Sequence, residues 1–482
     1  MSFFVRCGFL FVYCLVALWV LGANDFNVGT DLGIHYQFAQ DISRFSTWPL
    51  PPEAESPVMA HYPPAAHVLA NLLAPLAGST LNGILIVTAI SFIVIYLALA
   101  ELIRRNKPIE TCWALALFIL IAIICRSGRF LEGNEVVANF FFAQFAGTAG
   151  LLAGFLLLHS IRKRPFLLWL TTAALATHMV GWIYQVSAIE LALSCVMLQL
   201  ISFESDRLKE WIAKVLVSAA ILSSASIIHP TMIGSTGIAG NDGSISISTA
   251  SLVIGFLLLL SGTMILIANR DRTRLVNADA VSALSLGTLC ACALQAAALL
   301  AFGAGSAYAV KKYGFLIGTM SIVVVISLVL DRIAPGLPAN GRRLPEVLKG
   351  ALAPFFGIAS LITVTADRAK TSVDLLTDYD AAVRKFWERN YRPELDGTTI
   401  AWSSSVSPHV NYTVGLGVLR PRAAVDDQHA LFLPGKPLTG AATFILTDSA
   451  RARSLADTCL VAGDEAFAIV QANCMAGRAQ PR

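Results

Sequence analysis

Eleven apolar runs, each close to the length that crosses a lipid bilayer, constrain the fold of this chain more than any other feature. A transmembrane helix needs about 17–25 apolar residues, because in lipid the backbone must satisfy its own hydrogen bonds. Charged residues make up only 14% of the chain, compared with roughly 25% in soluble domains. The sequence therefore predicts an all-α polytopic membrane bundle. The expected spans are 5–22, 81–103, 111–125, 137–159, 166–183, 185–203, 211–229, 249–268, 279–303, 308–330 and 350–366.

The first outward loop, residues 23–80, is predicted to be the largest early loop. Its segment 66–77 is apolar but too short to span, which indicates a re-entrant or interfacial helix. The first run has an alternative interpretation as a cleaved signal peptide, because Arg6 precedes an apolar stretch that ends in Leu-Gly-Ala. Under either interpretation residues 24–80 face outward.

The distribution of lysine and arginine predicts the orientation, because cytoplasmic loops carry an excess of both. With eleven spans the amino terminus is expected in the cytoplasm of a bacterial inner membrane, and the tail in the periplasm. The residues that fall on the predicted cytoplasmic side are Arg6, Arg104, Arg105, Lys107, Arg162, Lys163, Arg164, Arg207, Lys209, Arg270, Arg272, Arg274, Arg332, Arg342, Arg343 and Lys349.

The chain divides into a membrane module, residues 1–366, and a more polar module, residues 367–482. The polar module is predicted to be a small α/β periplasmic domain. Its two cysteines, Cys459 and Cys474, are either a disulfide pair, which a periplasmic location allows, or two free thiols. The expected elements are a helix at 372–389, strands at 398–403 and 442–447, a short helix at 449–458, and a hairpin of 459–461 with 466–471.

Asp31 and His35 are the main candidates for chemistry, in the segment that follows the first span. If residues 32–42 form a helix, the two side chains lie one turn apart on the same face. A carboxylate there can act as a general base toward a hydroxyl or help to bind a divalent cation. The alternative role for Asp31 is an N-cap.

The predicted outer loops hold only five cations, Arg44, Arg126, Arg129, Lys311 and Lys312, and the last four stand out against the positive-inside pattern. A lipid phosphate needs cationic partners at headgroup depth, so these four residues are candidates for binding it. For the lysines, the alternative is snorkelling at the membrane interface.

Several other ionisable residues lie in the predicted outer loops or at the outer ends of helices, and few lie at mid-membrane depth. Because a transporter is expected to place its polar site at mid-depth, this pattern favours chemistry at the outer face. Glu132 or Glu135 is a candidate second acid, unless it simply pairs with Arg129. His178 and Glu190 are either substrate-binding or a buried polar pair.

His61 and Tyr62 are also candidates for substrate binding. They belong to the segment 61–67, in which two prolines fix the return of the loop to the membrane. The spacing of His61 and His67 does not indicate a zinc site.

The chain resembles the C-type polytopic membrane glycosyltransferases (GT-C), which use polyprenyl-phosphate-linked sugars. The resemblance lies in the segments Gly29–Tyr36, Met59–His67, Glu135–Gln144 and Tyr308–Lys312, and it covers roughly residues 1–330. It implies that Asp31 is the catalytic acid of the first loop and that Lys311 or Lys312 meets the lipid phosphate. Many members carry paired acids here, whereas Leu32 follows Asp31, so the need for Mg²⁺ or Mn²⁺ stays open.

Together these features predict an inverting transferase that moves a sugar from a polyprenyl phosphate carrier to a glycan, lipid or protein acceptor of the cell envelope. The alternatives are an O-antigen ligase or polymerase, and a lipid or solute transporter. Nucleic acid is not an expected partner, because the basic residues form no basic aromatic face.

Overall fold

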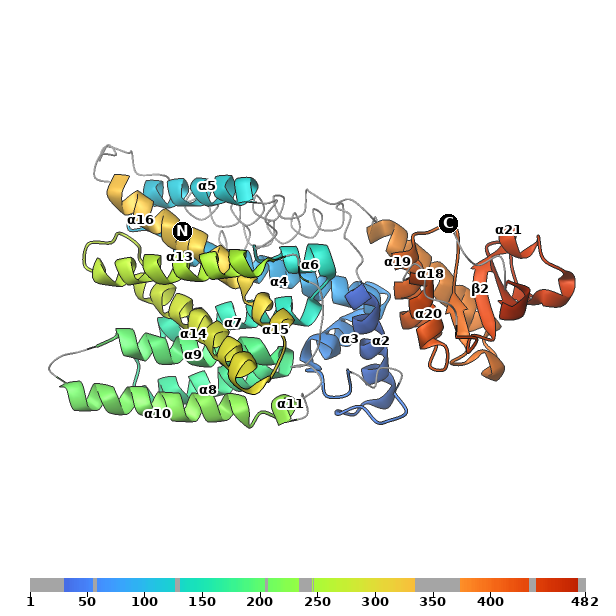
Figure 1. The fold of residues 1–482 in the computed structure, drawn as a ribbon, viewed down its shortest axis with the longest axis horizontal. Coiled ribbons are helices and arrows are strands. Elements are labelled where there is room, and N and C mark those ends of the chain that lie inside the picture. Colours follow the sequence, from blue (N-terminus) through green and yellow to red (C-terminus); the bar gives the residue numbers. More distant parts are fainter. Residues whose placement is uncertain are drawn as a thin grey trace.

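The computed structural model describes residues 30–54, 59–125, 131–203, 207–233, 245, 247–333, 373–432 and 439–475. In Figure 1 a bundle of long helices occupies one end of the molecule and a smaller α/β unit the other, with α2 and α3 between them. Two of the predicted spans, 5–22 and 350–366, lie outside the described residues.

The nine predicted spans within the described ranges are all helical, which confirms the all-α bundle. Seven helical segments among the described residues are long and apolar enough to cross a membrane, while α5 and α9 are shorter in their apolar part. The helices are α4 (Thr80–Ile103), α5 (Pro108–Cys125), α7 (Phe142–Ser160), α8 (Phe166–Ile183), α9 (Gln185–Ile201), α10 (Leu208–Ile227), α13 (Thr249–Ala268), α14 (Ala278–Phe302), α15 (Ala307–Lys312) and α16 (Gly314–Ile333).

Small residues let the helices of the bundle approach each other closely, as is usual in membranes. A side chain at Gly287 of α14 would overlap the backbone of Ser194 in α9. At Gly262 of α13, an added Cβ would lie 2.7 Å from a methyl carbon of Val324 in α16. These contacts fix the central helices α9, α13, α14 and α16 against one another.

One predicted span begins later than expected, and the difference shapes the outer end of the bundle. The run 137–159 is divided between α6 (Asn134–Asn139) and α7, because Phe140 adopts a left-handed backbone conformation with φ 59°. The break directs Phe141 and Phe142 toward the loops at this end. A similar break at Tyr184 separates α8 from α9, and the four-residue helix α11 (Pro230–Ile233) follows α10.

Two helices of the first outer loop lie between the bundle and the α/β unit (Figure 1). They are α2 (Thr30–Phe45) and α3 (Ala65–Ala77). The 13 residues of α3 would span only about 20 Å, less than the apolar thickness of a bilayer. The segment 66–77 is therefore a short helix, as predicted, and its re-entrant or interfacial position stays a prediction.

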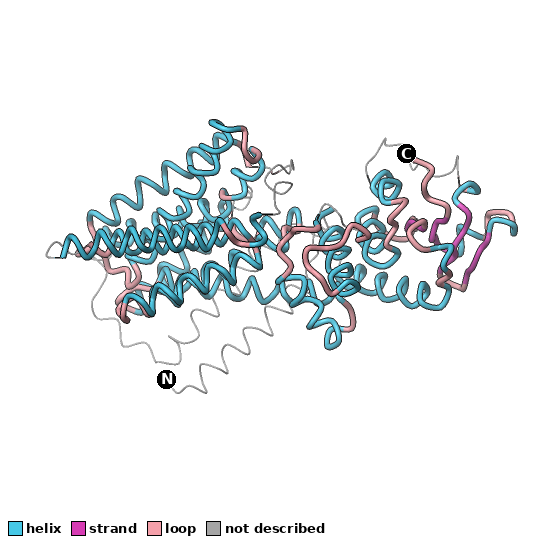
Figure 2. The backbone as a smooth tube through the Cα atoms, turned by 90° about the horizontal axis from the view of Figure 1, so that it is seen from below, coloured by secondary structure: helices cyan, strands magenta, loops and turns pink. Residues whose placement is uncertain are grey.

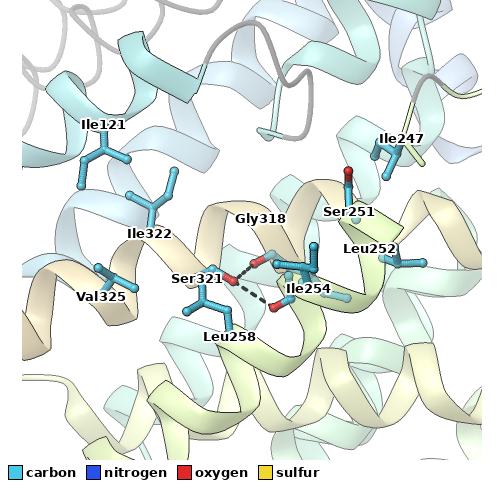
Figure 3. Close-up of a pocket in the computed structure, with 13 residues that line it drawn as sticks. Ile121, Ile247, Ser251, Leu252, Ile254, Leu258, Gly318, Ser321, Ile322 and Val325 are labelled. Atoms are coloured by element: carbon cyan, nitrogen blue, oxygen red, sulfur yellow. Dashed lines mark hydrogen bonds between the residues drawn. The ribbon is translucent and has the colours of Figure 1, made fainter. Parts of the chain in front are cut away.

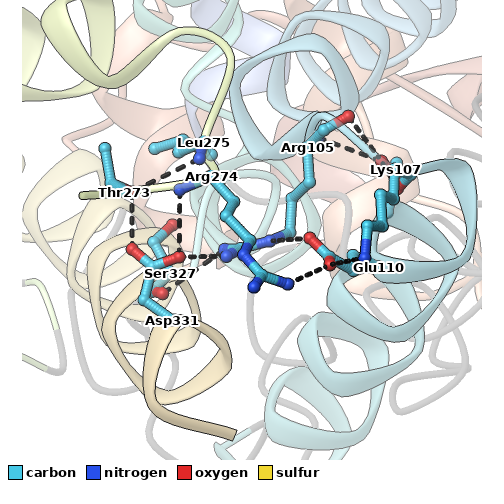
Figure 4. A network of polar contacts seen from close by, with 9 residues as sticks. Arg105, Lys107, Glu110, Thr273, Arg274, Leu275, Ser327 and Asp331 are labelled. Atoms are coloured by element: carbon cyan, nitrogen blue, oxygen red, sulfur yellow. Dashed lines mark hydrogen bonds and ion pairs between the residues drawn. The ribbon is translucent and has the colours of Figure 1, made fainter. Parts of the chain in front are cut away.

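The cationic loops 104–107 and 270–279 meet at the opposite end of the bundle. Arg105 forms a bridge with Leu275, and Arg270 pairs with Asp279 at 3.2 Å. Figure 4 shows how Arg105 also reaches Asp331 at the end of α16 and Glu110 at the start of α5. Arg105 and Arg270, two of the residues that predicted the cytoplasmic side, therefore lie at the same end of the bundle.

The C-terminal unit combines helices with a small mixed sheet, as the sequence predicts. The sheet order is β1-β2-β4-β3, with β1 parallel to β2 and the other pairs antiparallel. Figure 2 shows the strands in magenta at the end of the molecule away from the long helices. Cys459 and Cys474 form a disulfide. The elements are α18 (Val373–Asn390), β1 (Thr399–Ala401), α19 (Pro408–Val414), a π-helical turn η6 (Gly415–Leu419), α20 (Val425–Phe432), β2 (Phe444–Asp448), α21 (Ser449–Ala452), β3 (Leu460–Gly463) and β4 (Phe467–Gln471), with short 3₁₀ turns at Pro393–Leu395, Asp457–Cys459 and Ala472–Cys474.

The C-terminal unit packs directly on α2. The Tyr36 hydroxyl donates to Asp380 of α18 at 2.8 Å and accepts from Arg384. A side chain at Gly417 would overlap the Tyr36 ring, and Gly33 lies under the ring of Tyr412. Helix α2 is therefore held on both sides, by the bundle and by the C-terminal unit.

Candidate functional site

Asp31 lies in the first turn of α2, which begins at Thr30. Asp31 is thus a helical residue and does not occupy the N-cap position. In the first turn of a helix, the helix dipole still favours a negative charge. Burial raises the pKa of Asp31 to about 6, and the nearby charge of Lys312 opposes the rise. At neutral pH this group is largely ionised and is basic enough to accept a proton.

Lys312 ends α15, and its ammonium group is held by aromatic rings. Nζ lies 4.5 Å from the ring centroid of Tyr308, 4.9 Å from that of Phe141 and 5.9 Å from that of Tyr184. It also lies 3.4 Å from the Tyr184 hydroxyl. The faces of aromatic rings attract a cation without neutralising it. Among the described residues Lys312 makes no ion pair with a carboxylate, so its charge is available to an anion.

Three different helix junctions bring this ring cage together. Tyr184 is the residue between α8 and α9, Phe141 precedes α7, and Tyr308 is the second residue of α15. Gly147 of α7 allows the Tyr184 backbone to come close, because an added Cβ there would lie 2.5 Å from Tyr184 Cβ. The cage therefore depends on tight packing at the outer end of α7.

His35 and His67 form a buried pair beside this cage. His35 Nδ1 lies 2.9 Å from His67 Nε2, and the rings of Phe142 and Tyr62 pack against His35. Burial and the Lys312 charge lower the pKa of His35 to about 3, and burial also lowers the pKa of His67. Both imidazoles are neutral at physiological pH. His35 can therefore position a group by hydrogen bonding, while Asp31 is the stronger base of the two.

Three tyrosines from separate parts of the chain surround Asp31 within electrostatic range. They are Tyr62 of the first loop, Tyr308 of α15 and Tyr412 of α19. Burial raises the pKa of Tyr62 well above its ordinary value, and the Asp31 charge adds to the rise. These phenols stay protonated and can donate hydrogen bonds. The first loop, the bundle and the C-terminal unit thus meet around one carboxylate.

Glu132, in the turn before α6, and Glu135, in the first turn of α6, form a second acidic position. Gly133 N–H donates to Glu135 Oε2 at 2.7 Å, while the Glu132 backbone is tied to Tyr96 and Thr319. Burial raises the pKa of both carboxyl groups, and for Glu135 the Glu132 charge raises it further. Helix α6 contacts α2, which carries Asp31. Arg129, and with it the predicted pairing to these acids, lies outside the described residues.

The remaining predicted site residues are spread more widely. Tyr62 joins the cluster around Asp31, whereas His61 is exposed and its ring faces Trp48 at a centroid distance of 6.4 Å. Lys311 is partly exposed and, unlike Lys312, lies outside the ring cage. Arg126, like Arg129, lies outside the described residues.

His178 and Glu190 are not partners of each other. His178 Nε2 accepts from Trp182 at 3.2 Å, and its ring lies 4.6 Å from that of His229. Glu190 is buried, and Glu132 is the carboxylate within its electrostatic range. The two residues that the sequence pairs on adjacent helices therefore belong to different neighbourhoods.

Tyr184 and Phe141 both contact Lys312, although neither is among the candidates that the sequence patterns indicate. Only Tyr184 carried a usable signal, as an aromatic residue between the predicted spans 166–183 and 185–203, whereas Phe141 falls inside the predicted span 137–159. The sequence gives no indication that His67 binds zinc, and in the structure it is the partner of His35. Within the described part of the chain there is no group of three or more metal-ligating side chains placed to hold an ion.

An apolar cavity of about 360 Å³ lies between α13 and α16, with Ile121 of α5 at its edge (Figure 3). Its lining includes Leu252 and Ile254 of α13 and Ile317 of α16. Gly314, the first residue of α16, also lines it and lies two residues after Lys312. One part of the cavity lining therefore lies close in the chain to Lys312.

No family model matches the sequence, and no curated protein matches it. Two solved structures of ArnT from Cupriavidus metallidurans are similar to this chain over nearly its whole length. The form bound to undecaprenyl phosphate matches with a TM-score of 0.49 and 13% identity over 98% of each chain. The apo form matches with a TM-score of 0.45 and 13% identity over 96% of each chain. Both TM-scores lie below 0.5, and the function proposed below rests on the residues of this chain.

Proposed function

We propose that this protein is a membrane glycosyltransferase that moves a sugar from a polyprenyl phosphate carrier to an acceptor on the outer face of the membrane. The observation that carries the proposal is the meeting of Asp31, a base whose pKa burial raises to about 6, with Lys312, a cation that aromatic rings hold. Transfer of a phosphate-linked sugar needs both a base for the acceptor and a cation for the leaving group.

In the proposed reaction the acceptor hydroxyl oxygen attacks the anomeric carbon as the carboxylate of Asp31 removes its proton. The bond between the anomeric carbon and the phosphate oxygen breaks, and the phosphate leaves with the electron pair. Lys312 stabilises the growing negative charge on that oxygen through its ammonium group. Because attack and departure occur on opposite faces of the sugar, the anomeric configuration inverts.

The apolar cavity between α13 and α16 supports a polyprenyl carrier. Its lining is almost wholly apolar, and its Gly314 end lies close to Lys312. A phosphate beside Lys312 would therefore place the first prenyl units beside the Gly314 end of this cavity. In this arrangement Lys312 is the cation of both the donor phosphate site and the Asp31 site.

The outward orientation is part of the proposal. Cationic loops gather at the end of the bundle opposite to Asp31, and the C-terminal unit carries the Cys459–Cys474 disulfide. Lysine and arginine mark the cytoplasmic side, and disulfides persist in oxidising compartments such as the periplasm. Both observations support an Asp31 site on the periplasmic side of an inner membrane.

The test is to delete the gene in the source organism and complement it with wild type, Asp31→Asn or Glu53→Gln. A general base contributes about 10²–10⁴-fold to rate, so Asp31→Asn should accumulate lipid-linked sugar and lose one sugar from the surface glycan. Glu53→Gln is the matched control, because it removes an exposed carboxylate from the same loop. The measurement is mass spectrometry of carrier lipids and surface glycans.

Equal restoration by Asp31→Asn and wild type would remove Asp31 from the reaction. A deletion strain with unaltered lipids and glycans would contradict the transferase and favour a transporter. Repeating the assay in membranes with and without EDTA decides whether Mg²⁺ or Mn²⁺ is needed.

A further inference from the structure

The C-terminal unit contains a separate cavity of about 250 Å³ at the end of its parallel strand pair. Trp402, Ser403 and Ser404 follow β1, and Arg451 lies just after β2. Strands β1 and β2 are parallel, so the segments after them leave the sheet at the same end, the carboxyl ends of the two strands. In α/β folds ligands usually bind outside the carboxyl ends of the strands.

Hydrogen bonds fix the walls of this cavity. Asp448, the last residue of β2, accepts from the hydroxyls of Ser403 and Ser405 and from the Ser404 amide at 2.8 Å. Asn411 of α19 bonds to both backbone groups of Ser403, at 3.0 and 2.7 Å. A loop held by so many bonds is preformed, which lowers the entropic cost of binding.

The cavity presents several donors beside apolar walls. The Arg451 guanidinium carbon lies 3.3 Å from the ring centroid of Trp402, so the indole holds the guanidinium in place. Gln428 bonds to Ala401 through its amide oxygen and its amide nitrogen, and that nitrogen keeps a second N–H. Val406 and Leu431 supply apolar surface.

This combination suits a sugar ring. A sugar presents hydroxyl groups around its rim and C–H groups on its faces, so it needs planar donors, hydroxyls and apolar walls together. Planar polar groups are supplied by arginine, asparagine and glutamine, and a hydroxyl by Ser404. The volume of about 250 Å³ is close to the lower end of the range for small-ligand pockets, roughly 300–1,000 Å³. It therefore suits one or two sugar units.

Helix α19 links this cavity to Asp31. Asn411 lines the cavity, while the next residue, Tyr412, packs on Gly33 of α2 and lies within electrostatic range of Asp31. The seven residues of α19 thus separate the cavity from the first turn of α2. A glycan bound in the cavity would be held on the same side of α2 as the proposed base.

We propose that the Trp402–Arg451 cavity is a carbohydrate subsite that holds one or two sugar units of the acceptor glycan. Its role in holding the acceptor rests on the proposed transferase function, whereas its binding of sugar does not.

The test is saturation-transfer NMR on the full chain in lipid nanodiscs, which avoids sugar-containing detergents. The probes are the disaccharides lactose, cellobiose, N,N′-diacetylchitobiose and xylobiose, and separately sodium phosphate. Wild type and Asp31→Asn should both saturate ring protons of at least one disaccharide. Arg451→Gln should weaken that binding about tenfold, as expected for loss of a charged hydrogen-bond donor.

A second variant, Ser404→Trp, fills the cavity from an exposed position and should abolish the signal. Arg453→Gln is the matched control, because it removes an exposed arginine two residues away and should leave binding unchanged. Sugar binding that persists in both cavity variants, or no disaccharide signal from wild type, would overturn the proposal. Phosphate binding that replaces sugar binding would also overturn it.

The same experiment separates the two proposals. If the deletion strain keeps its glycans while the cavity variants lose disaccharide binding, the transferase fails and the carbohydrate subsite stands. If Asp31→Asn blocks transfer while disaccharides bind equally to wild type and Ser404→Trp, the subsite fails and the transferase stands.

Discussion

The two ends of the helical bundle surround their cations with different kinds of partner. At the end with the cationic loops, Arg105 pairs with Glu110 at 3.6 Å and with Asp331, and Arg274 reaches Glu110 at 2.7 Å (Figure 4). At the other end, aromatic rings surround Lys312, and among the described residues no carboxylate pairs with it. The first arrangement leaves few charges for a ligand, whereas the second leaves a cation that an incoming anion can neutralise.

This difference separates structural charges from functional ones. A buried ion pair contributes little beyond holding its neighbours in one geometry, but removing one partner leaves a costly unpaired charge. Lys312 is only partly buried, and its removal leaves no unpaired partner among the described residues. Its removal should therefore cost the fold little while it harms ligand binding. The comparison predicts a large loss of stability at one end and a small loss at the other.

The largest expected effect on stability is that of Arg105→Met. The Arg105 side chain is 1% exposed, and its loss leaves Asp331 and Glu110 short of a partner. We expect a loss of about 3–5 kcal/mol in the free energy of unfolding. Activity per folded molecule should be unchanged, because the site lies at the other end. Thermal unfolding of the purified protein and a transfer assay on the same sample measure the two quantities.

Arg104→Met is the matched control for this variant. Arg104 pairs with Glu101, but the two side chains are 50% and 41% exposed. An exposed pair of this kind contributes about 0–1 kcal/mol. Equal destabilisation by both variants would show that the buried network is not what holds these loops together.

Lys312→Met should produce the reverse pattern, with little loss of stability and a large loss of activity. Removing one group that stabilises developing negative charge typically costs about 10²–10³-fold in rate. Lys311→Met is the matched control, since it removes a lysine that lies outside the ring cage. Steady-state rates and thermal unfolding of both variants test this prediction. A Lys312→Met protein with low stability and normal activity per folded molecule would make Lys312 a structural cation.

The contrast between the two lysines shows where sequence reasoning stops. Hydropathy located the nine described spans, since each must present a continuous apolar surface to lipid. Adjacent residues on a helix point about 100° apart, so only the packing of α15 decides which lysine enters the ring cage. The pattern at 311–312 therefore gave a pair of candidates, and the structure separates them.

Local sequence patterns could not predict the ring cage around Lys312, for a related reason. Tyr184, Phe141 and Tyr308 come from three helix junctions that are far apart in the sequence. Their meeting depends on close helix approach at Gly147 and on the left-handed turn at Phe140. Periodicity identifies helices but does not say which of their ends meet. The C-terminal strands were easier to predict, because alternating apolar residues and turn residues mark each one locally.

The pH dependence of transfer should report the same site. Because burial raises the pKa of Asp31 to about 6, its base form is lost as the pH falls through 6. We expect kcat/KM to decline about tenfold per pH unit below that value. The Lys312 charge lowers this pKa, so Lys312→Met should move the acidic limb to higher pH. An acidic limb that is identical in wild type and Lys312→Met would mean that another group controls the profile.

The junction between α2 and the C-terminal unit offers an intermediate case and the smallest effect. The Tyr36 hydroxyl donates to Asp380 at 2.8 Å and accepts from Arg384, and these two residues also pair at 3.2 Å. Tyr36→Phe removes the hydroxyl but leaves the ion pair, so we expect a loss of about 1 kcal/mol in unfolding free energy.

Tyr391→Phe, at an exposed position after α18, is the control and should have no effect. Thermal unfolding and limited proteolysis of the C-terminal unit measure the change. A loss as large as that of Arg105→Met would show that the Asp380–Arg384 pair depends on Tyr36 for its compensation, and would place this junction with the paired network at the other end of the bundle.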